Sequence, residues 1–291
     1  MNAWRLIDSG PGSGPWNLAL DEAIFHSVRA GASPPTLRLY RWSAPALSIG
    51  YAQDRERDVD RDACRERGIA VLRRITGGRA VLHDAEVTYS VAAPAGLPGF
   101  GTGLDAAYRM VAAGLIAGLK LLGLRAAVPS PGPRDPSRPH RHAACFATTA
   151  RHEIAVEGRK LIGSAQRREG GAFLQHGSIL LESHGDLLGQ VLRSHPATKN
   201  VAGMTGLADV LPLCPDPATV VAAVVGGCAV AWDACFLPGE LGPAEVQAAR
   251  ALEASRYGSV DWNAGAEKST NPLFPPFERE MKGVCCSGKC T

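Results

Sequence analysis

The sequence predicts an α+β fold in which a mixed, mostly antiparallel sheet is flanked by helices. Short strand-like segments form hairpins before the most regular helix, a second group of strands follows it, and the last third is rich in helical patterns. Because strands and helices do not alternate regularly, a doubly wound parallel fold is not favoured. With 291 residues, the chain can bury one large core. We expect one domain over residues 1–265 and an irregular, cysteine-containing tail over 266–291.

The first third of the chain combines strand patterns with two helices. A strand at Trp4–Ile7 precedes an amphipathic helix at Trp16–Val28, whose first half carries Asp21 and Glu22. A charged helix at Asp58–Arg67 should end at Gly68. The remaining segments are rich in β-branched and aromatic residues and predict strands at Thr36–Trp42, Ala46–Tyr51, Ile69–Leu72, Ala80–Leu82 and Val87–Ala92.

The most regular helix is expected at Leu104–Leu122, with one apolar face formed by Leu104, Tyr108, Val111, Leu115, Leu119 and Leu122. Prolines exclude regular structure from Pro129–Pro139, which we expect to be an exposed loop. Three further strands are predicted at Glu153–Val156, Lys160–Ala165 and Ala172–Leu181. Helices should follow at Asp186–Leu192, Pro217–Ala231 and Pro243–Arg256, with irregular chain from Asn263 onward.

Composition places the chain among globular proteins, with 45% apolar and 20% charged residues. The net charge of +3 does not favour nucleic-acid binding, although basic residues gather in 55–79 and 134–168 and could face an acidic protein partner. The longest apolar runs, such as Val220–Val225, are far shorter than the roughly 20 residues that span a bilayer. Because the N-terminus lacks a signal-peptide pattern, we expect a cytoplasmic protein whose eight cysteines are mostly free thiols.

Residues 73–90, RRITGGRAVLHDAEVTYS, form the most informative block. Gly77 and Gly78 allow a sharp turn and leave room for a ligand against the backbone. Arg73, Arg74 and Arg79 surround that turn with guanidinium groups suited to phosphate or carboxylate oxygens. The alternative is an ordinary glycine turn of a hairpin with solvated arginines.

A second block, from Cys145 to Ser178, is dense in reactive residue types. Cys145 follows a basic, proline-rich stretch, where nearby cations stabilise a thiolate; the alternative is a buried, inert thiol. Lys160 opens an apolar strand and is either a solvated edge residue or a point charge that holds a carbonyl oxygen. His176 is either a hydrogen-bonded structural histidine, which the pattern favours, or a ligand or base.

Together with WNLALDEAIF near the start and RYGSVDWNAG near the end, the two blocks form an ordered set of four motifs. This set resembles the lipoate–protein ligase and octanoyltransferase family of the biotin/lipoate ligase superfamily, and the resemblance spans about residues 3–265. It implies the α+β fold of the catalytic domain of biotin and lipoate ligases.

Within this family the chain is most similar to the cysteine-dependent octanoyltransferases. Cys145-Phe146 precedes the GRKLIGSAQ motif, and the tail after Trp262 is too short for the additional C-terminal domain of lipoate ligases. The resemblance implies transfer of an octanoyl group from octanoyl-acyl carrier protein to the acceptor lysine of a lipoyl domain, in an E2 subunit or the glycine cleavage H protein. Cys145 would form the thioester and Lys160 would polarise the acyl carbonyl. Neither ATP, another cofactor nor a metal ion is expected.

The same resemblance implies an acyl-binding tunnel. Its expected substrate-binding residues are Arg73, Arg74, Gly77, Gly78, Arg79, His83, Gly163, Ser164 and His176. Three alternatives are an amidotransferase acting between lipoyl domains, an ATP-dependent lipoate ligase, and a non-catalytic lipoyl-domain binder. The resemblance does not explain Cys285, Cys286 and Cys290, which are too few to complete a four-ligand zinc site alone.

Overall fold

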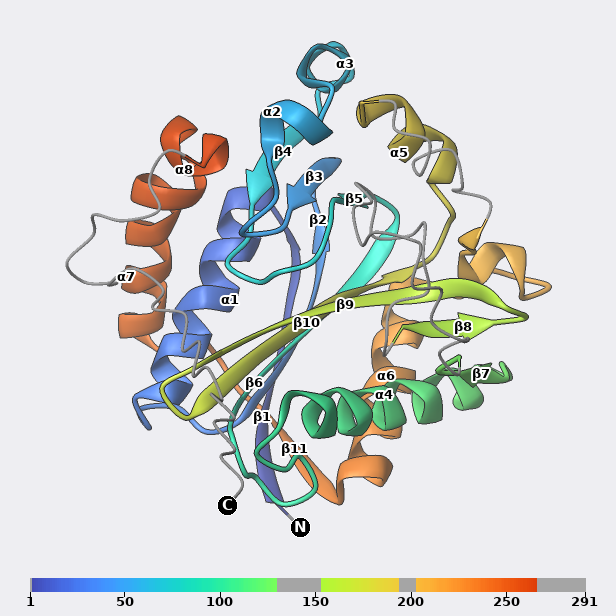
Figure 1. The fold of residues 1–291 in the computed structure, drawn as a ribbon. Coiled ribbons are helices and arrows are strands. Elements are labelled where there is room, and N and C mark those ends of the chain that lie inside the picture. Colours follow the sequence, from blue (N-terminus) through green and yellow to red (C-terminus); the bar gives the residue numbers. More distant parts are fainter. Residues whose placement is uncertain (1, 130–152, 194–202, 266–291) are drawn as a thin grey trace, which may run out of the picture.

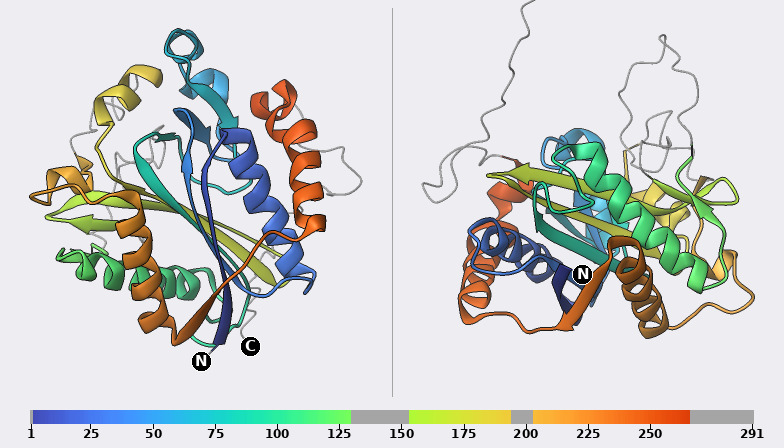
Figure 2. Two further views of the ribbon diagram at one scale, coloured as in Figure 1. Left: turned by 180° about the vertical axis from the view of Figure 1, so that it is seen from behind. Right: turned by 90° about the horizontal axis from the view of Figure 1, so that it is seen from below.

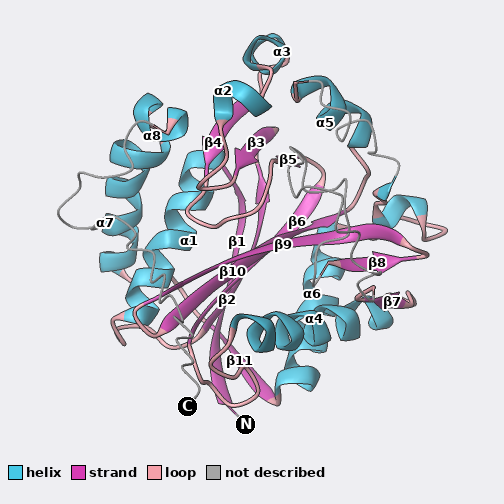
Figure 3. Cartoon of the chain, in the orientation of Figure 1, coloured by secondary structure: helices cyan, strands magenta, loops and turns pink. Residues whose placement is uncertain are grey.

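The computed structural model describes residues 2–129, 153–193 and 203–265, which include two β-sheets. Figures 1 and 3 show that the strands of the larger sheet cross the middle of the molecule and that helices surround them. Its eight strands run in the order β11 (Ala234–Pro238), β1 (Asn2–Gly12), β2 (Thr36–Trp42), β6 (Glu86–Pro94), β10 (Ala172–Leu180), β9 (Arg159–Glu169), β8 (Ile154–Val156) and β7 (Ala126–Ala127). The smaller sheet has the order β4 (Ala70–Arg73), β3 (Ala46–Ile49) and β5 (Val81–His83).

Both sheets are mixed. β1 pairs in parallel with β11 and β2, and every other pairing in the large sheet is antiparallel. In the small sheet β3 is parallel to β4 and antiparallel to β5. The predicted mixed, mostly antiparallel α+β fold is therefore confirmed.

Helices cover both faces of the large sheet (Figure 2). On one face, α4 (Leu104–Leu121) and α6 (Pro217–Trp232) pack on each other and on the sheet. On the other face lie α1 (Gly14–Arg29) and α7 (Pro243–Leu252), and α7 continues through a π-helical turn at Glu253–Tyr257. The shorter helices are α2 (Arg55–Asp58), α3 (Arg61–Glu66), α5 (Gly185–Val191) and α8 (Val260–Ala264), with a 3₁₀ turn at Leu207–Asp209.

The strand β6 shows why the sheet is buried on both faces. Val87, Tyr89 and Val91 point into the core beneath α4 and α6, whereas Ala92 packs on the α1 face. Successive side chains of a strand point to opposite faces, so a strand covered on both sides needs apolar or fully bonded side chains at almost every position. The near-continuous apolar character of VTYSVAA, residues 87–93, follows from this position.

Most predicted elements are present, but the structure differs from the predictions at several places. The helix predicted at Asp58–Arg67 is wrong, because the chain forms two short helices whose N-termini are capped by Asp54 and Asp60. Between them Val59 is extended and fully buried, and it forms a bridge with Leu192. The structure also contains β7, β11 and α8 in segments for which no strand or helix was predicted. The predicted buried face of α4 is wrong at its first position, since Leu104 is 48% exposed.

Within the described residues no helix is both long and apolar enough to cross a membrane. The loop predicted at Pro129–Pro139 lies outside the described residues from position 130 onward, as do the predicted tail 266–291 and its cysteines.

Candidate active site

A pocket lies between the two sheets. The small sheet contributes Ser48, Val81 and His83, and α1 contributes Leu18. The large sheet supplies a mostly aromatic and small-residue wall, made of Tyr40, Trp42, Thr88, Gly163, Ser164, Ala165, His176, Gly177 and Ser178. Arg74 completes the lining. Five of the predicted substrate-binding residues therefore meet at one pocket, namely Arg74, His83, Gly163, Ser164 and His176.

Arg74 is the centre of a buried hydrogen-bond network beside this pocket. Its Nη1 donates to the backbone oxygen and to Oγ of Ser48, each at 3.0 Å. Its Nη2 donates to the carbonyl oxygens of Gly77 and Arg79, and its Nε donates to Oγ1 of Thr76 at 3.1 Å. Arg74 thus holds the chain from Thr76 to Arg79 against the small sheet.

One branch of the network leads from Arg74 to Glu86. His83 Nε2 lies 2.7 Å from Ser48 Oγ, and His83 Nδ1 lies 2.9 Å from Glu86 Oε1. A carboxylate only accepts, so Nδ1 donates to Glu86 Oε1, while Ser48 Oγ also accepts from Arg74 Nη1. The His83 ring stacks on Trp42, with 3.9 Å between the ring centroids. Glu86 also accepts from Ser178 Oγ at 2.9 Å.

A second branch leads from Arg74 to Asp21. Thr76 Oγ1 accepts from Arg74 and donates to His176 Nε2 at 2.7 Å, while His176 Nδ1 donates to Asp21 Oδ2 at 3.0 Å. Burial lowers the pKa of His176, against the opposing effect of Asp21, so the ring is held neutral near pH 7. Burial alone would raise the pKa of Asp21, but Arg38 and His176 bring it below its usual value. His176 therefore combines a structural hydrogen-bonding role with a place in the pocket wall.

The double-glycine segment is a packed loop between strands that do not pair with each other. β4 and β5 both pair with β3, so the interpretation of Gly77-Gly78 as a simple hairpin turn is wrong. Gly78 has φ of +88°, and its carbonyl oxygen would lie only 2.1 Å from a Cβ at Gly50. A methyl group placed on Gly77 would meet nothing within 4 Å. The loop thus depends on glycine at 78 and 50 for backbone conformation and close approach.

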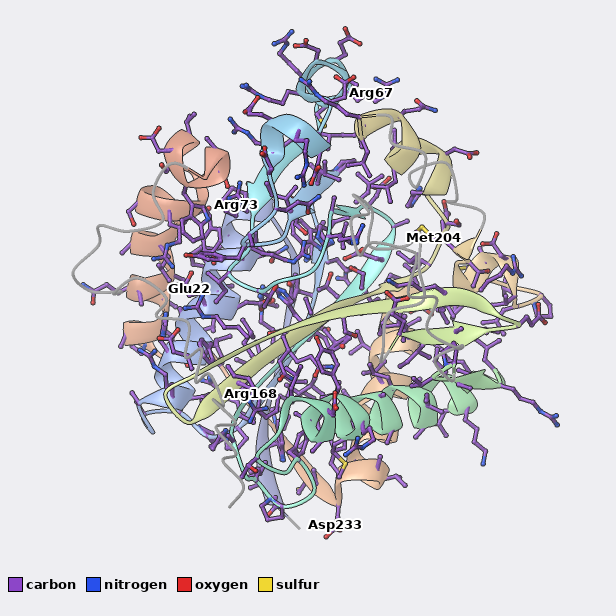
Figure 4. All side chains as sticks on the ribbon, in the orientation of Figure 1. Glu22, Arg67, Arg73, Arg168, Met204 and Asp233 are labelled. Atoms are coloured by element: carbon purple, nitrogen blue, oxygen red, sulfur yellow. The ribbon has the colours of Figure 1, made fainter. Side chains whose placement is uncertain are left out.

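Arg73 and Arg79 lie differently from Arg74. The Arg73 guanidinium donates to the carbonyl oxygens of Gly50, Tyr51, Gln53 and Trp262 and does not line the pocket. Figure 4 shows it on the side of the small sheet that faces α8. Burial lowers the pKa of Arg73. Arg79 is half-buried and contributes its carbonyl oxygen to Arg74.

Lys160 reaches the pocket face of the large sheet because of a β-bulge. Ile154 pairs with Ile162, but Ala155 pairs with Lys160, so Leu161 is an extra residue in β9. Without the bulge Lys160 would share the face of Ile162, which is in the α4–α6 core. With the bulge it lies opposite that core, on the face of Gly163 and Ala165, but Lys160 itself does not line the pocket. Its neighbour Met204, which forms a bridge with Lys160, is near the end of β9 remote from Arg168 in Figure 4.

A model of the lipoyl protein ligase A/B catalytic domain matches residues 13–229. The chain belongs to this family. The family assignment predicted from four short motifs is therefore confirmed, and the match covers the glycine loop, the bulged strand and both histidine branches.

Relatives of this family are similar over nearly the whole chain. An octanoyltransferase LipM of Moorella thermoacetica is 41% identical over 89% of this chain and 97% of the relative. An octanoyltransferase LipM of Symbiobacterium thermophilum is 42% identical over 89% of this chain and 97% of the relative. Among solved structures, a lipoate-protein ligase A bound with ATP superposes with a TM-score of 0.77 at 28% identity, covering 91% of this chain and 99% of that one.

The catalytic residue expected at Cys145 lies outside the described residues, and its role in this family member stays a prediction. In the described ranges, no group of three or more His, Cys, Asp and Glu side chains could hold a metal ion.

Several residues of the site were not singled out in the sequence. Asp21, Ser48, Glu86 and Glu153 are all buried, and each forms a hydrogen bond with a residue that was. A weak signal was available for two of them: Asp21 interrupts the apolar face of an otherwise amphipathic helix, and Glu153 stands across a short hairpin from Lys160. The pairing of Ser48 with His83 carried no such signal, because the two residues belong to separate strands of one sheet.

Proposed function

We propose that this member of the family transfers an octanoyl group from octanoyl-acyl carrier protein to the ε-amine of a lysine on a lipoyl domain, through a thioester on Cys145. The observation that carries the proposal is the similarity to octanoyltransferases of 41–42% identity, which extends over 97% of their length. The pocket supports it, because Leu18, Tyr40, Trp42, Val81 and Ala165 give it an apolar surface that suits an acyl chain.

The proposed reaction has two exchanges. The Cys145 thiolate attacks the thioester carbonyl, the carrier-protein thiolate leaves and takes up a proton, and an octanoyl-cysteine is formed. The acceptor amine then attacks the new thioester, the C–S bond breaks, and the amine proton passes to the released thiolate. Lys160, as an ammonium, stabilises the negative charge that develops on the carbonyl oxygen in both steps.

The partners follow from this reaction. The donor is an acylated carrier protein, and the acceptor is the lipoyl domain of an E2 subunit or the glycine cleavage H protein. These proteins meet in the cytoplasm, which is the location expected from the sequence. The domain over residues 1–265 would carry the whole activity, with residues 266–291 as an appended segment.

An ATP-dependent ligase is the second candidate, because the fold and 28% of the aligned residues are shared with a lipoate-protein ligase A bound with ATP. In such an enzyme the glycine loop would hold a nucleotide. In this chain the Arg74 guanidinium donates to Ser48, Gly77 and Arg79, so these donors are engaged within the protein. That arrangement favours a pocket for an acyl chain.

Intact-mass measurement after incubation with octanoyl-acyl carrier protein tests the proposal. We expect an octanoyl adduct on the wild-type protein and none on Cys145→Ser, with transfer to a lipoyl domain that does not depend on ATP. Transfer that uses octanoate and ATP, without a covalent adduct, would establish the ligase instead. Transfer only from an octanoylated lipoyl domain would establish the amidotransferase, and acylation in any of these assays excludes a non-catalytic binder.

A further inference from the structure

We infer that Glu153 is a positioning residue of the acyl-transfer site, whose carboxylate holds the Lys160 ammonium on the pocket face of the large sheet throughout the reaction. The inference rests on the proposed function, because it assigns Glu153 a role through the lysine that polarises the acyl carbonyl. It begins from an ion pair between Lys160 Nζ and Glu153 Oε1.

Both members of this pair are removed from solvent. The side chains of Lys160 and Glu153 are only 4% and 5% exposed. Transfer of a single charge into such surroundings is strongly unfavourable unless an opposite charge compensates it. Replacement of the pair by apolar residues is commonly neutral or stabilising, so stability alone gives weak reason for a lysine and a glutamate here. A role in the chemistry of the neighbouring pocket supplies that reason.

The backbone brings the two side chains to one face by two separate features. A tight turn at Glu157 and Gly158, with φ of 52° and 75°, joins β8 to β9 and fixes their register. Ile154 and Val156 point into the α4–α6 core, so Glu153 and Ala155 point to the opposite face. The bulge at Leu161 then turns Lys160 to that same face. Without the bulge the lysine would point into the apolar core, away from both Glu153 and the pocket.

The chemistry of the pair suits a lysine that acts as a fixed cation. Lysine carries its charge on a flexible four-carbon stem, so an isolated ammonium samples many positions. An ammonium has three N–H donors, and the bond to Glu153 uses one of them and fixes the direction of the others. The proton of the acceptor amine goes to the departing cysteine thiolate, as in the scheme above.

Glu153→Gln tests this role, since glutamine keeps the size of the side chain and removes its charge. We expect kcat for octanoyl transfer to fall about tenfold or more, with KM for the donor changed by less than about threefold, because the lost interaction orients a group that acts in the transition state. Glu153→Asp keeps the carboxylate and should recover part of kcat. The matched control is Glu157→Gln, which removes a 72% exposed carboxylate from the same hairpin and should leave kcat unchanged.

A double-mutant cycle shows whether Glu153 acts through Lys160. In the Lys160→Met background, Glu153→Gln should cause no further loss of activity. An unchanged kcat in Glu153→Gln, or an equal loss of kcat in both backgrounds, would overturn the inference.

Thermal unfolding of the wild type, Glu153→Gln, Lys160→Met and the double variant tests the ion pair independently of the reaction. Each single variant removes one member of this buried ion pair, so each should lower Tm by about 5 °C or more, and the double variant should recover most of that loss. Additive effects on Tm would refute the assigned contact whatever the protein catalyses. If the effects on Tm are coupled but the wild-type protein transfers no acyl group, the proposed reaction is wrong and the contact stands.

Discussion

At the scale of single residues, Arg74 shows how a cation in a glycine-rich motif can serve the protein itself. A guanidinium has five N–H donors, and those of Arg74 are directed at two hydroxyls and three carbonyl oxygens of the chain. Each of the two hydroxyls is hydrogen-bonded to a histidine, and each histidine is hydrogen-bonded to a buried carboxylate, either Glu86 or Asp21. The Arg74 guanidinium is therefore linked through Ser48 and Thr76 to two histidines and two buried carboxylates.

This arrangement predicts a dependence of stability on pH through His176. Burial lowers the pKa of His176 in the folded protein, whereas the unfolded chain has the ordinary value of about 6.5. As pH falls below about 6.5, the unfolded chain takes up a proton that the folded protein resists, and the free energy of unfolding decreases. At higher pH both states are neutral and this contribution is constant. Urea unfolding of the wild-type protein between pH 5 and 7.5 measures it.

His176→Asn is the comparison for this prediction, because the amide can still donate to Asp21 but does not titrate. We expect the variant to be less stable than the wild type at pH 7.5 and the difference to narrow toward pH 5. Two parallel curves would mean that His176 does not carry the pH dependence.

Particular residues also show what could be predicted at this scale. Arg74 was singled out by its residue type, whereas His83, Gly163 and Ser164 were expected only from the family resemblance and His176 was favoured as a structural histidine. All five line one pocket. Glu86 and Ser48 were not singled out, since their importance lies in hydrogen bonds with His83 that depend on tertiary packing. Glu153 required knowledge of the strand register opposite Lys160.

At the scale of elements, alternation and turn chemistry predicted β2, β3, β6, β8 and β10 closely, because each strand has a strong pattern and a clear boundary. Two local deviations escaped prediction. The bulge lets the consecutive residues Leu161 and Ile162 both pack into the same core, which the strict alternation of side chains in a regular strand does not predict. The buried Val59 divides a charged segment whose composition favours one continuous helix.

The glycine loop gives a prediction at this scale. Gly50→Ala would place a methyl group 2.1 Å from the Gly78 carbonyl oxygen, so the loop must move away from the small sheet. We expect a loss of about 1–3 kcal/mol in the free energy of unfolding and a raised KM for the acyl donor. Gly77→Ala is the control, because its methyl group would meet nothing within 4 Å. If both variants behave alike in urea unfolding and in steady-state kinetics, close contact between Gly50 and Gly78 does not shape the pocket.

At the scale of the whole molecule, the C-terminal helices connect α1 to the small sheet through hydrogen bonds. Glu22 of α1 accepts from Arg256 and from the Tyr257 hydroxyl, the latter at 2.6 Å. The motif RYGSVDWNAG then turns back to Arg73, whose backbone N–H donates to Asn263 Oδ1 at 2.8 Å and whose carbonyl oxygen accepts from Trp262 Nε1 at 2.8 Å. The N-terminal helix motif and the arginine–glycine block therefore both contact the RYGSVDWNAG motif, although the contacting residues are 180 or more positions apart in the sequence.

Arg73→Lys separates the two functions of the paired arginines. Lysine cannot reach the four carbonyl oxygens that the Arg73 guanidinium binds, so several buried acceptors lose a charged donor. We expect a loss of about 2–3 kcal/mol in the free energy of unfolding, with little change in KM for the acyl donor, because Arg73 lies outside the pocket lining. Arg74→Lys should instead release the glycine loop and raise KM as well. Urea unfolding and steady-state kinetics of the two variants provide the comparison. A raised KM with unchanged stability in Arg73→Lys would mean that Arg73 binds substrate, as its place beside Arg74 in the sequence predicts.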